Sequence, residues 1–216
     1  MKTLSALLIP IFPLVVNAAA FTAPHPISGM QHLFRGAQPL GKAEVIRGEN
    51  IEEVVIFKND VKGEVAREIS ELGAEGVAHT HIPMAWKQID PRVACEQTIE
   101  ALQILVRAER SGRRTYIHCT AGEDRTGMIA GLARMLLTNA TADDVFADEL
   151  CKHGYADGNP NKPRKVVGDI EAGLTPLFFA IAEKIEGGAF VESRMTDDFC
   201  GSLVLDKRAV RRCGGR

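Results

Sequence analysis

The sequence carries almost no net charge and has no long hydrophobic run after its first twenty residues. Lysine and arginine number 26 and aspartate and glutamate 28 in a chain of 216 residues, which gives a net charge of −2. So small a charge gives no support to a nucleic-acid-binding protein held by phosphate contacts. Apolar residues make up 45% of the chain and charged residues 25%. These ordinary fractions exclude a disordered chain, a collagen-like repeat and a membrane protein with several spans.

Internal repeats and low-complexity tracts are absent as well, so the length indicates one domain with a full-sized core, or at most two small ones. The chain also has no Cys-x2-Cys pair. His79 and His81 flank one residue on an expected strand and therefore share a face, but no third ligand stands nearby in the sequence. Because a zinc site needs three or four ligands, we expect no metal and no cofactor.

The first twenty residues differ from the rest of the chain. Lys2 gives a short positive region, residues 4–16 are apolar, and Ala18-Ala19-Ala20 forms a small-residue cleavage site. This is the pattern of a secretory signal peptide. The apolar run is short for a bilayer span and contains two prolines. No cysteine stands near the cleavage point to carry a lipid. We therefore expect a periplasmic or secreted protein without a stable membrane anchor after cleavage.

Five cysteines are an odd number for a chain marked for export. In an oxidising compartment an even set usually pairs, so four would form disulfides and one would stay free. Cys200 and Cys213 are the pair most easily joined, because they are close in sequence. Cys95 either forms a disulfide or is a small core residue of an amphipathic helix, and Cys151 is the fourth candidate. Cys119 is the cysteine with a chemical reason to remain a free thiol.

Hydrophobic periodicity predicts strands that alternate with helices. The expected strands are 32–38, 51–57, 76–83 and 115–118, and the expected helices are 40–47, 61–72, 91–110, 125–137, 141–152 and 166–185, the last as one helix or a pair. This alternation favours a single α/β domain with a mainly parallel central sheet flanked by helices. We divide the chain into a signal peptide at 1–20, an extended leader at 21–31, the domain at 32–190 and a C-terminal extension at 191–216. The extension ends in a basic tail, which we interpret as solvated.

Residues 118–127 read His-Cys-Thr-Ala-Gly-Glu-Asp-Arg-Thr-Gly and lie between an expected strand and an expected helix. Ligands bind at the carboxyl ends of strands in such sheets, and the amides of a strand-to-helix loop form an anion-binding concavity. Gly122 permits tight curvature, and Arg125 can hold two phosphate oxygens. Cys119 lies over the same amides, which lowers the pKa expected for its thiol. The segment is equipped for nucleophilic attack on a bound phosphate.

The pattern His-Cys-x5-Arg-Thr resembles the signature loop of the cysteine-dependent protein tyrosine and dual-specificity phosphatases. The full string is especially similar to their compact bacterial members, and Phe-Arg-Gly-Ala-Gln-Pro at 34–39 resembles an N-terminal segment of those enzymes. The resemblance covers residues 33–155 and implies a cysteine-phosphatase-like domain without metal or cofactor. Its implied partner is a phosphorylated protein or a small phosphomonoester, and no nucleic acid. The oligomeric state stays open.

By that resemblance, Cys119 is the nucleophile and forms a phosphocysteine intermediate. Arg125 and the loop amides would bind the phosphoryl group and its charge-dispersed transition state. These amides belong to Thr120, Ala121, Gly122, Glu123, Asp124 and Arg125. Thr126 would donate a hydrogen bond to the departing thiolate, and His118 would orient the loop.

Two aspartates compete for the role of general acid, which protonates the leaving oxygen. Asp90 lies 29 residues before Cys119 in a loop that precedes a helix, as the acid of the dual-specificity enzymes does. Its position as the N-cap before Pro91 explains it equally well. Asp124 matches the loop aspartate implicated in bacterial phosphatases whose loop reads Gly-Lys-Asp-Arg-Thr-Gly. We leave both open and lean slightly to Asp124.

Glu123 departs from that pattern, because those loops and the phosphoinositide phosphatases carry lysine there. An acid at this position favours a phosphoprotein or aryl phosphate over highly phosphorylated inositols. Cations from other loops could still approach the site: Lys87, Arg92, His153, Lys162, Arg164 and Lys165. We therefore expect an exported phosphotyrosine or dual-specificity phosphatase, with two alternatives. One is an inositol phosphate or phosphoinositide phosphatase, and the other is a phosphate-binding pseudophosphatase. A rhodanese-like sulfurtransferase fits the spacing poorly.

Overall fold

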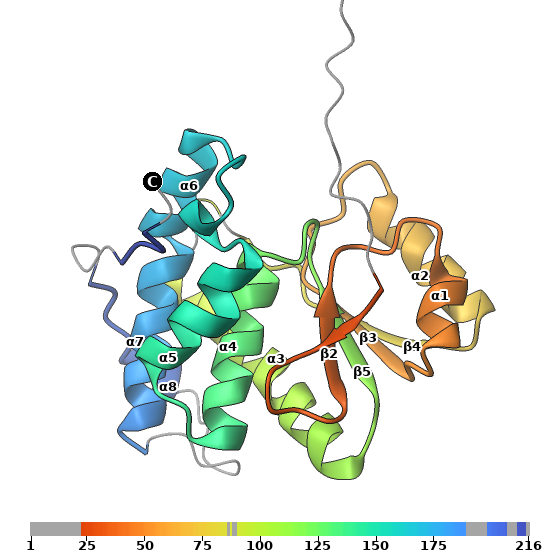
Figure 1. Ribbon diagram of the computed structural model, residues 1–216, viewed down its shortest axis with the longest axis horizontal. Coiled ribbons are helices and arrows are strands. Elements are labelled where there is room, and N and C mark those ends of the chain that lie inside the picture. Colours follow the sequence, from red (N-terminus) through yellow and green to blue (C-terminus); the bar gives the residue numbers. More distant parts are fainter. Residues whose placement is uncertain (1–22, 86, 88–89, 189–197, 207–210, 215–216) are drawn as a thin grey trace, which may run out of the picture.

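Strands and helices alternate along the chain in the computed structural model, which describes residues 23–85, 87, 90–188, 198–206 and 211–214 (Figure 1). Within these residues one sheet contains β1 (His25–Pro26), β2 (Leu33–Gly36), β3 (Glu53–Ile56), β4 (Ala78–His81) and β5 (Thr115–His118). The spatial order is β1-β2-β5-β3-β4. β1 pairs antiparallel with β2, and the other neighbours are parallel. The predicted α/β fold with a mainly parallel sheet is confirmed.

The helices flank this sheet. They are α1 (Ala43–Gly48), α2 (Glu64–Ala74), α3 (Pro91–Ser111), α4 (Asp124–Thr138), α5 (Ala142–Val145), α6 (Arg164–Ala172), α7 (Leu174–Glu186) and α8 (Asp198–Gly201). A π-helical turn η1 (Phe146–Leu150) and two 3-10 turns, η2 (Cys151–His153) and η3 (Ala156–Gly158), connect α5 to α6. The single helix expected at 141–152 is therefore replaced by three kinds of helical turn. The last expected helix is a pair that meets at Gly173.

Two helix starts are capped by side chains, and the cap at Asp90 is one that the sequence predicts. The Asp90 carboxylate accepts hydrogen bonds from the amides of Arg92 and Val93 at the start of α3. The Thr141 hydroxyl accepts one from the amide of Asp144 at the start of α5. The helix expected from residue 61 begins later, at Glu64. Gly63 in the left-handed conformation precedes it and leaves Val61 52% exposed.

Each face of the sheet has its own hydrophobic core. Alternate residues of a strand point to opposite faces, so Val54 and Ile56 of β3 pack under α1 and α2, while Val55 and Phe57 face the larger group of helices. Figure 1 shows α1 and α2 on one side of the strands and α3, α4 and α7 on the other.

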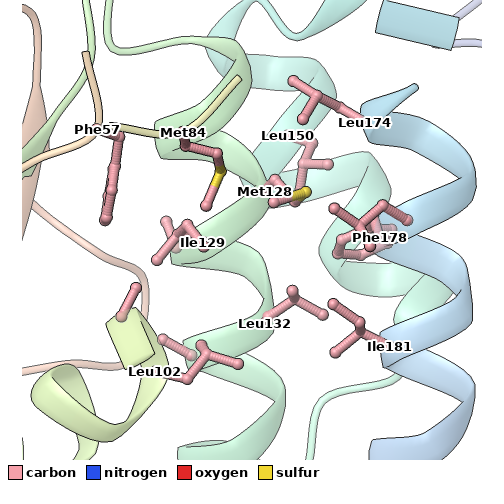
Figure 2. Packing of buried hydrophobic residues seen from close by; sticks show 14 of the residues in the cluster. Phe57, Met84, Leu102, Met128, Ile129, Leu132, Leu150, Leu174, Phe178 and Ile181 are labelled. Atoms are coloured by element: carbon pink, nitrogen blue, oxygen red, sulfur yellow. The ribbon is translucent and has the colours of Figure 1, made fainter. Parts of the chain in front are cut away.

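Helix α4 lies at the centre of the larger core. Figure 2 shows Met128, Ile129 and Leu132 of α4 between Phe57 and Met84 on one side and α7 on the other. Every residue of α4 from Arg125 to Ala133 is buried. A helix enclosed in this way is held rigidly, and its first turn carries the residues of the motif.

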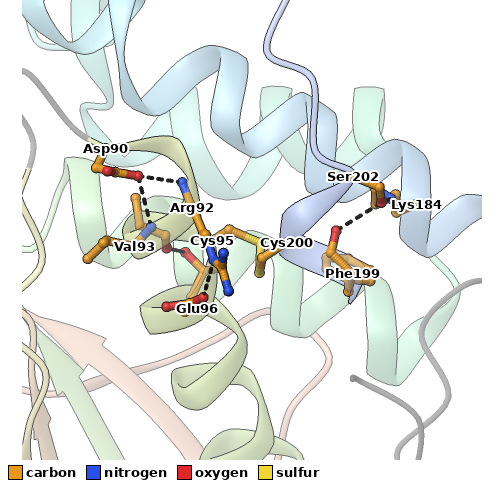
Figure 3. Close-up of a disulfide and its surroundings, with 11 residues drawn as sticks. Asp90, Arg92, Val93, Cys95, Glu96, Lys184, Phe199, Cys200 and Ser202 are labelled. Atoms are coloured by element: carbon orange, nitrogen blue, oxygen red, sulfur yellow. Dashed lines mark hydrogen bonds and ion pairs between the residues drawn. A yellow bond between two sulfur atoms is a disulfide. The ribbon is translucent and has the colours of Figure 1, made fainter. Parts of the chain in front are cut away.

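Two disulfides attach the C-terminal part to this core. Cys95 of α3 is joined to Cys200 of α8, and Cys151 of η2 is joined to Cys213. Cys119 is the free cysteine. Four paired cysteines and one free thiol were expected, but the expected Cys200–Cys213 pair is wrong. Sequence proximity lowers the entropy of loop closure, whereas the fold decides which sulfurs meet. Figure 3 shows α8 lying against α3, so that Cys200 faces Cys95.

The two ends of the described chain also pack onto the domain. Residues 1–22, which include the expected signal peptide, lie outside the described residues. In the expected leader, β1 extends the sheet and Ile27 enters the larger core. In the basic tail, Arg211 forms an ion pair with Asp143, and Arg212 forms one with Glu171. These two arginines are therefore bound to the domain rather than only solvated.

Candidate active site

The motif loop lies at the carboxyl end of the central strand. Cys119 directly follows β5, which lies between β2 and β3, and α4 begins at Asp124. The register places Gly36 and Ile56, the last residues of the neighbouring strands, beside His118. The carboxyl ends of three parallel strands thus meet at the loop, which is the ligand-binding edge of such a sheet.

The surrounding residues bind the carbonyl groups of this loop. The carbonyl of Cys119 accepts a hydrogen bond from Nδ1 of His118 at 2.9 Å. The carbonyl of Thr120 accepts one from the backbone N–H of Gln38 at 3.2 Å. The carbonyl of Gly122 accepts one from Nη2 of Arg35 at 2.8 Å. In a trans peptide a carbonyl and the following N–H point in opposite directions, and the described residues contain no cis peptide bond. The amides of residues 120, 121 and 123 therefore point away from this scaffold, as an anion-binding loop requires.

The loop backbone touches β2 so closely that only glycine fits. Gly122 has φ +74°, and a Cβ there would lie 2.2 Å from the carbonyl oxygen of Gly36. A Cβ on Gly36 would lie 2.4 Å from the phenol oxygen of Tyr116, which donates a hydrogen bond to the carbonyl of Ala37 at 2.6 Å. Burial raises the pKa of Tyr116, so its phenol keeps the proton that it donates. Gly36 and Ala37 of the segment Phe-Arg-Gly-Ala-Gln-Pro thus pack directly against the motif loop and β5.

Arg35 connects the loop to the helical side of the molecule. Its side chain is fully buried, and Nη1 lies 2.6 Å from both the carboxylate and the carbonyl oxygen of Glu149 in η1. Its Nη2 binds Gly122, as described above. Because Glu149 is only 1% exposed, each of the two buried charges is compensated by the other rather than by water.

The environment of Cys119 favours the thiolate. The residue is 4% exposed, and burial by itself would raise the pKa of the thiol. The positive charge of Arg125 and the hydroxyl and amide of Thr126 lower it, the charge of Asp124 raises it, and the net pKa lies below its ordinary value. The Thr126 hydroxyl is buried and makes no regular hydrogen bond in the structure, and its effect on the Cys119 pKa shows that it lies near the thiol. A free cysteine with a lowered pKa has the reactivity of a nucleophile, which is what the role expected for Cys119 requires.

Arg125 is held in place from two neighbouring strands. Its Nη1 donates to the carbonyl of Phe57 after β3 at 2.9 Å and to that of Met84 after β4 at 3.1 Å. Its Nη2 lies 3.5 Å from the hydroxyl of Thr120. The guanidinium has five N–H donors, and anchoring through Nη1 leaves the other end directed at the loop. This end is suited to bind two oxygens of a phosphate.

A buried polar chain leads from the loop to α2. Nε2 of His118 lies 2.7 Å from Oε1 of Glu68, although the two groups are not aligned as a regular hydrogen bond. The other oxygen of Glu68 accepts from the side-chain amide of Gln38 at 2.8 Å, and the amide oxygen of Gln38 accepts from Lys58 at 2.8 Å. The chain fixes the ring of His118 and, through it, the carbonyl of Cys119.

The two candidate acids have different surroundings. Oδ1 of Asp124 accepts hydrogen bonds from the amide of Ala156 at 2.9 Å and from Nζ of Lys162 at 2.6 Å. Asp90 is exposed and caps α3 through its Oδ1. Figure 3 shows Asp90 at the end of α3 where the Cys95–Cys200 disulfide joins α8. Asp124 thus belongs to the motif loop, and Asp90 belongs to the start of a neighbouring helix.

Comparison with known proteins agrees with this geometry. A model of the tyrosine phosphatase family matches residues 40–169, which is more than half of the chain. The chain belongs to the tyrosine phosphatase family. A search of curated protein sequences gives no match.

Solved structures with the same fold are also phosphatases. P. aeruginosa TpbA in complex with pTyr has a TM-score of 0.53 and 20% identity, over 80% of this chain and 97% of that chain. A kinase associated phosphatase with serine in place of its catalytic site cysteine has a TM-score of 0.55 and 16% identity, over 82% and 99%. The catalytic domain of the PP-IP phosphatase SIW14 from S. cerevisiae has a TM-score of 0.50 and 18% identity, over 76% and 92%. At these identities the similarity establishes the fold.

In this member of the family, most of the cations expected near the loop have partners. Arg92 pairs with Glu96, and Lys165 with Asp169, each on its own helix. His153 stacks on His25 with ring centroids 5.2 Å apart. Lys162 pairs with both Glu123 and Asp124, while Lys87 and Arg164 are exposed. His81 binds the carbonyl of Lys58, and no group of three or more potential metal ligands occurs in the described part of the chain.

Sequence reasoning missed the residues that support the loop. The segment at 34–39 was noted as a resemblance, but no role followed for Arg35 or Gln38. Glu68 and Glu149 lie in amphipathic helical segments, where acids are usually solvated. A possible signal was Arg35 itself, a charged residue in an otherwise apolar strand.

No described helix has the length and apolar character that a membrane crossing requires.

Proposed function

We propose that this protein hydrolyses phosphomonoesters through a phosphocysteine intermediate, with Cys119 as the nucleophile. The observation that carries the proposal is a buried free thiol of lowered pKa at an amide-lined loop, with Arg125 directed at the same loop. Attack on phosphorus requires an activated nucleophile together with groups that hold the phosphoryl oxygens, and this site provides both. Because both nucleophile and arginine are present, we favour an enzyme over a phosphate-binding pseudophosphatase.

The reaction proceeds in two steps. The thiolate of Cys119 attacks phosphorus, so that an S–P bond forms while the P–O bond to the leaving group breaks and a general acid protonates the leaving oxygen. Water then attacks the phosphocysteine, the same acid, now a base, takes a proton from the water, and the S–P bond breaks to release inorganic phosphate. Arg125 and the amides of residues 120–125 stabilise the transferring group in both steps. The Thr126 hydroxyl stabilises the thiolate as it leaves.

The substrate that we favour is a phosphotyrosine or related protein monoester. Glu123 and Asp124 place two carboxylates at the loop, and Lys162 pairs with both of them. Arg92 and Lys165 pair with acids of their own helices, which leaves less positive charge for a highly phosphorylated inositol. The TpbA structure, which binds pTyr, supports the same substrate class. An inositol phosphate or phosphoinositide remains the alternative, supported by the fold that the chain shares with a PP-IP phosphatase.

A phosphate-release assay tests the activity. The substrates are an aryl phosphate, a phosphotyrosyl peptide, a phosphoseryl peptide and an inositol polyphosphate, each with chelator and with vanadate. We expect release from the first two, loss with vanadate, and no effect of the chelator. Cys119→Ser should lower kcat by at least about a thousandfold while substrate binding is kept. Activity that depends on metal, or that survives Cys119→Ser, would contradict the mechanism.

The general acid can be identified by comparing Asp90→Asn with Asp124→Asn. The residue that donates the proton should lower kcat when changed and flatten the basic limb of the pH profile. The effect should shrink for an aryl phosphate whose leaving group needs no proton. An equal response of good and poor leaving groups would exclude the tested residue as the acid.

We further propose that the protein works in the periplasm or outside the cell. The support is the signal-like sequence at 1–20 together with four cysteines in disulfides, which persist in oxidising compartments. Cell fractionation and N-terminal sequencing of the mature protein test this. We expect cleavage after Ala20, whereas an uncleaved cytosolic chain would exclude it.

A further inference from the structure

Two adjacent acidic residues lie in the loop that, by the proposed function, binds the phosphate dianion of the substrate. Glu123 and Asp124 stand between the nucleophile and Arg125 in the sequence, and the charge of Asp124 raises the pKa of the Cys119 thiol. Two negative charges beside a bound phosphate would repel it. The proposed function therefore requires something that offsets them.

Lys162 meets both acids. Its Nζ lies 2.6 Å from Oδ1 of Asp124, 2.9 Å from Oε2 of Glu123 and 2.8 Å from the carbonyl oxygen of Gly154. An ammonium group has three N–H donors, and here three acceptors surround it. The side chain is only 7% exposed, so its attraction to the carboxylates is weakly screened by solvent.

The segment around Lys162 is fitted to the same two side chains. Asn159 donates from its side-chain amide to Oε1 of Glu123 at 3.0 Å, and the amide of Ala156 donates to Asp124. A Cβ on Gly154 would lie 3.1 Å from the carboxyl carbon of Glu123, so the backbone packs directly on that group. Residues 154–162 thus hold both carboxylates in one place.

We propose that Lys162 is a positioning residue of the phosphate loop, which offsets the charges of Glu123 and Asp124 and fixes the places of their carboxylates. This inference rests on the proposed function, because it concerns the same loop. Lys162, which follows Cys119 by 43 positions in the sequence, thus lets the loop attract an anion. Lys162 itself needs no contact with the substrate.

Removing the charge tests the proposal. Lys162→Met keeps most of the length of the side chain and should weaken about tenfold the inhibition of Cys119 alkylation by inorganic phosphate. It should also move the midpoint of Cys119 alkylation by iodoacetamide about one pH unit upward, because the field of Asp124 is then unopposed. Both measurements work without turnover. They therefore remain informative if Cys119→Ser shows that the proposed catalysis fails.

Two further variants separate charge from structure. Lys162→Arg should retain most of the phosphate inhibition, and Glu123→Gln added to Lys162→Met should restore part of it, because one of the unopposed charges is gone. Lys165→Met is the matched control: it removes a lysine three residues away that pairs with Asp169 of its own helix α6, and it should change neither measurement. A Lys162→Met protein that has lost thermal stability but keeps the wild-type alkylation midpoint and phosphate inhibition would overturn the proposal.

Should Lys162→Met fail to fold, Glu123→Gln in the otherwise unchanged protein decides the question. Lys162 then has one carboxylate fewer to offset. The alkylation midpoint should move to lower pH, and phosphate inhibition should tighten. Unchanged values in this variant would overturn the proposal, and values that move in the opposite direction would do so as well.

Discussion

The motif loop has two supports, and they differ in chemistry. The sheet-side support, residues 35–38, binds the loop's backbone: Arg35 holds the carbonyl of Gly122, and the amide of Gln38 holds that of Thr120. The helical-side support, residues 154–162, binds side chains and is largely ionic, through Lys162 on Glu123 and Asp124. One support shapes the loop and the other sets its charge. Variants on the two sides should therefore fail in different ways.

The largest effect is expected on the sheet side, from Arg35→Met. The change removes the hydrogen bond to Gly122 and leaves Glu149 buried without its partner, and breaking a buried ion pair in this way costs about 3–5 kcal/mol. We expect the free energy of unfolding to fall by that amount in urea, together with loss of activity. Arg47→Met removes an exposed arginine on α1 and should stay within about 0.5 kcal/mol of wild type. Equal stabilities of the two variants would exclude the structural role of Arg35.

On the helical side, the comparable change is the double variant Cys151→Ser/Cys213→Ser. This disulfide closes a loop of 62 residues and anchors η2, directly before the helical-side support. Its loss should lower the free energy of unfolding by about 2–4 kcal/mol. The double variant Cys95→Ser/Cys200→Ser, with a separation of 105, serves for comparison. We expect phosphate inhibition to weaken more in the first variant, and the reverse order would contradict the role given to residues 154–162.

Gly122→Ala probes the shape of the loop with little change in charge. The new Cβ would lie 2.2 Å from the carbonyl oxygen of Gly36, so the loop must shift, and a misplacement of about 1 Å costs about a hundredfold in rate. Gly41→Ala is the matched control, because its φ of +74° carries the same backbone strain while nothing lies within 4 Å. We expect kcat/KM to fall in the first variant alone. A similar fall in both would assign the effect to backbone strain rather than to contact with β2.

The smallest effect is expected from Thr126→Ala, because Thr126 belongs to the motif loop itself and to neither support. The hydroxyl lowers the pKa of Cys119, so its removal should raise that pKa. Because the thiolate is the reactive form, the acid limb of the kcat/KM profile should move to higher pH by the same amount. Thr126→Ser keeps the hydroxyl and should keep the wild-type profile. An unchanged acid limb in the alanine variant would contradict the proposed hydrogen bond.

The difference between the supports also explains how far sequence reasoning could reach. The α/β fold, the capping by Asp90 and the position of Cys119 between β5 and α4 depend on short stretches of sequence, in which periodicity and turn residues are visible. Part of the sheet-side support was visible too, because residues 34–39 form a continuous segment. Its deeper contacts were not, since Glu149 is 114 residues from Arg35.

The helical-side support left no recognisable pattern in the sequence. Lys162 was noted only as one of several cations that could approach the substrate, and the structure directs it to the acids of the loop instead. The disulfide partners were equally hidden, because the choice between Cys200 and Cys213 depends on how α8 and residues 211–213 pack. Such contacts arise from tertiary packing, and only the packed fold specifies them.

The two disulfides cross in the sequence: Cys151 lies between Cys95 and Cys200, and Cys200 lies between Cys151 and Cys213. Each bond needs a cysteine from the last part of the chain. While the chain is being synthesised, Cys95, Cys119 and Cys151 are therefore present together before either correct partner exists. The same low pKa that suits Cys119 for catalysis would make it the most reactive thiol of the three once the loop has formed. If the proposed export takes place while the chain is synthesised, oxidation in the order of synthesis would consume the thiol of Cys119. Correct pairing would then require folding ahead of oxidation or a catalyst that reshuffles the first bonds formed.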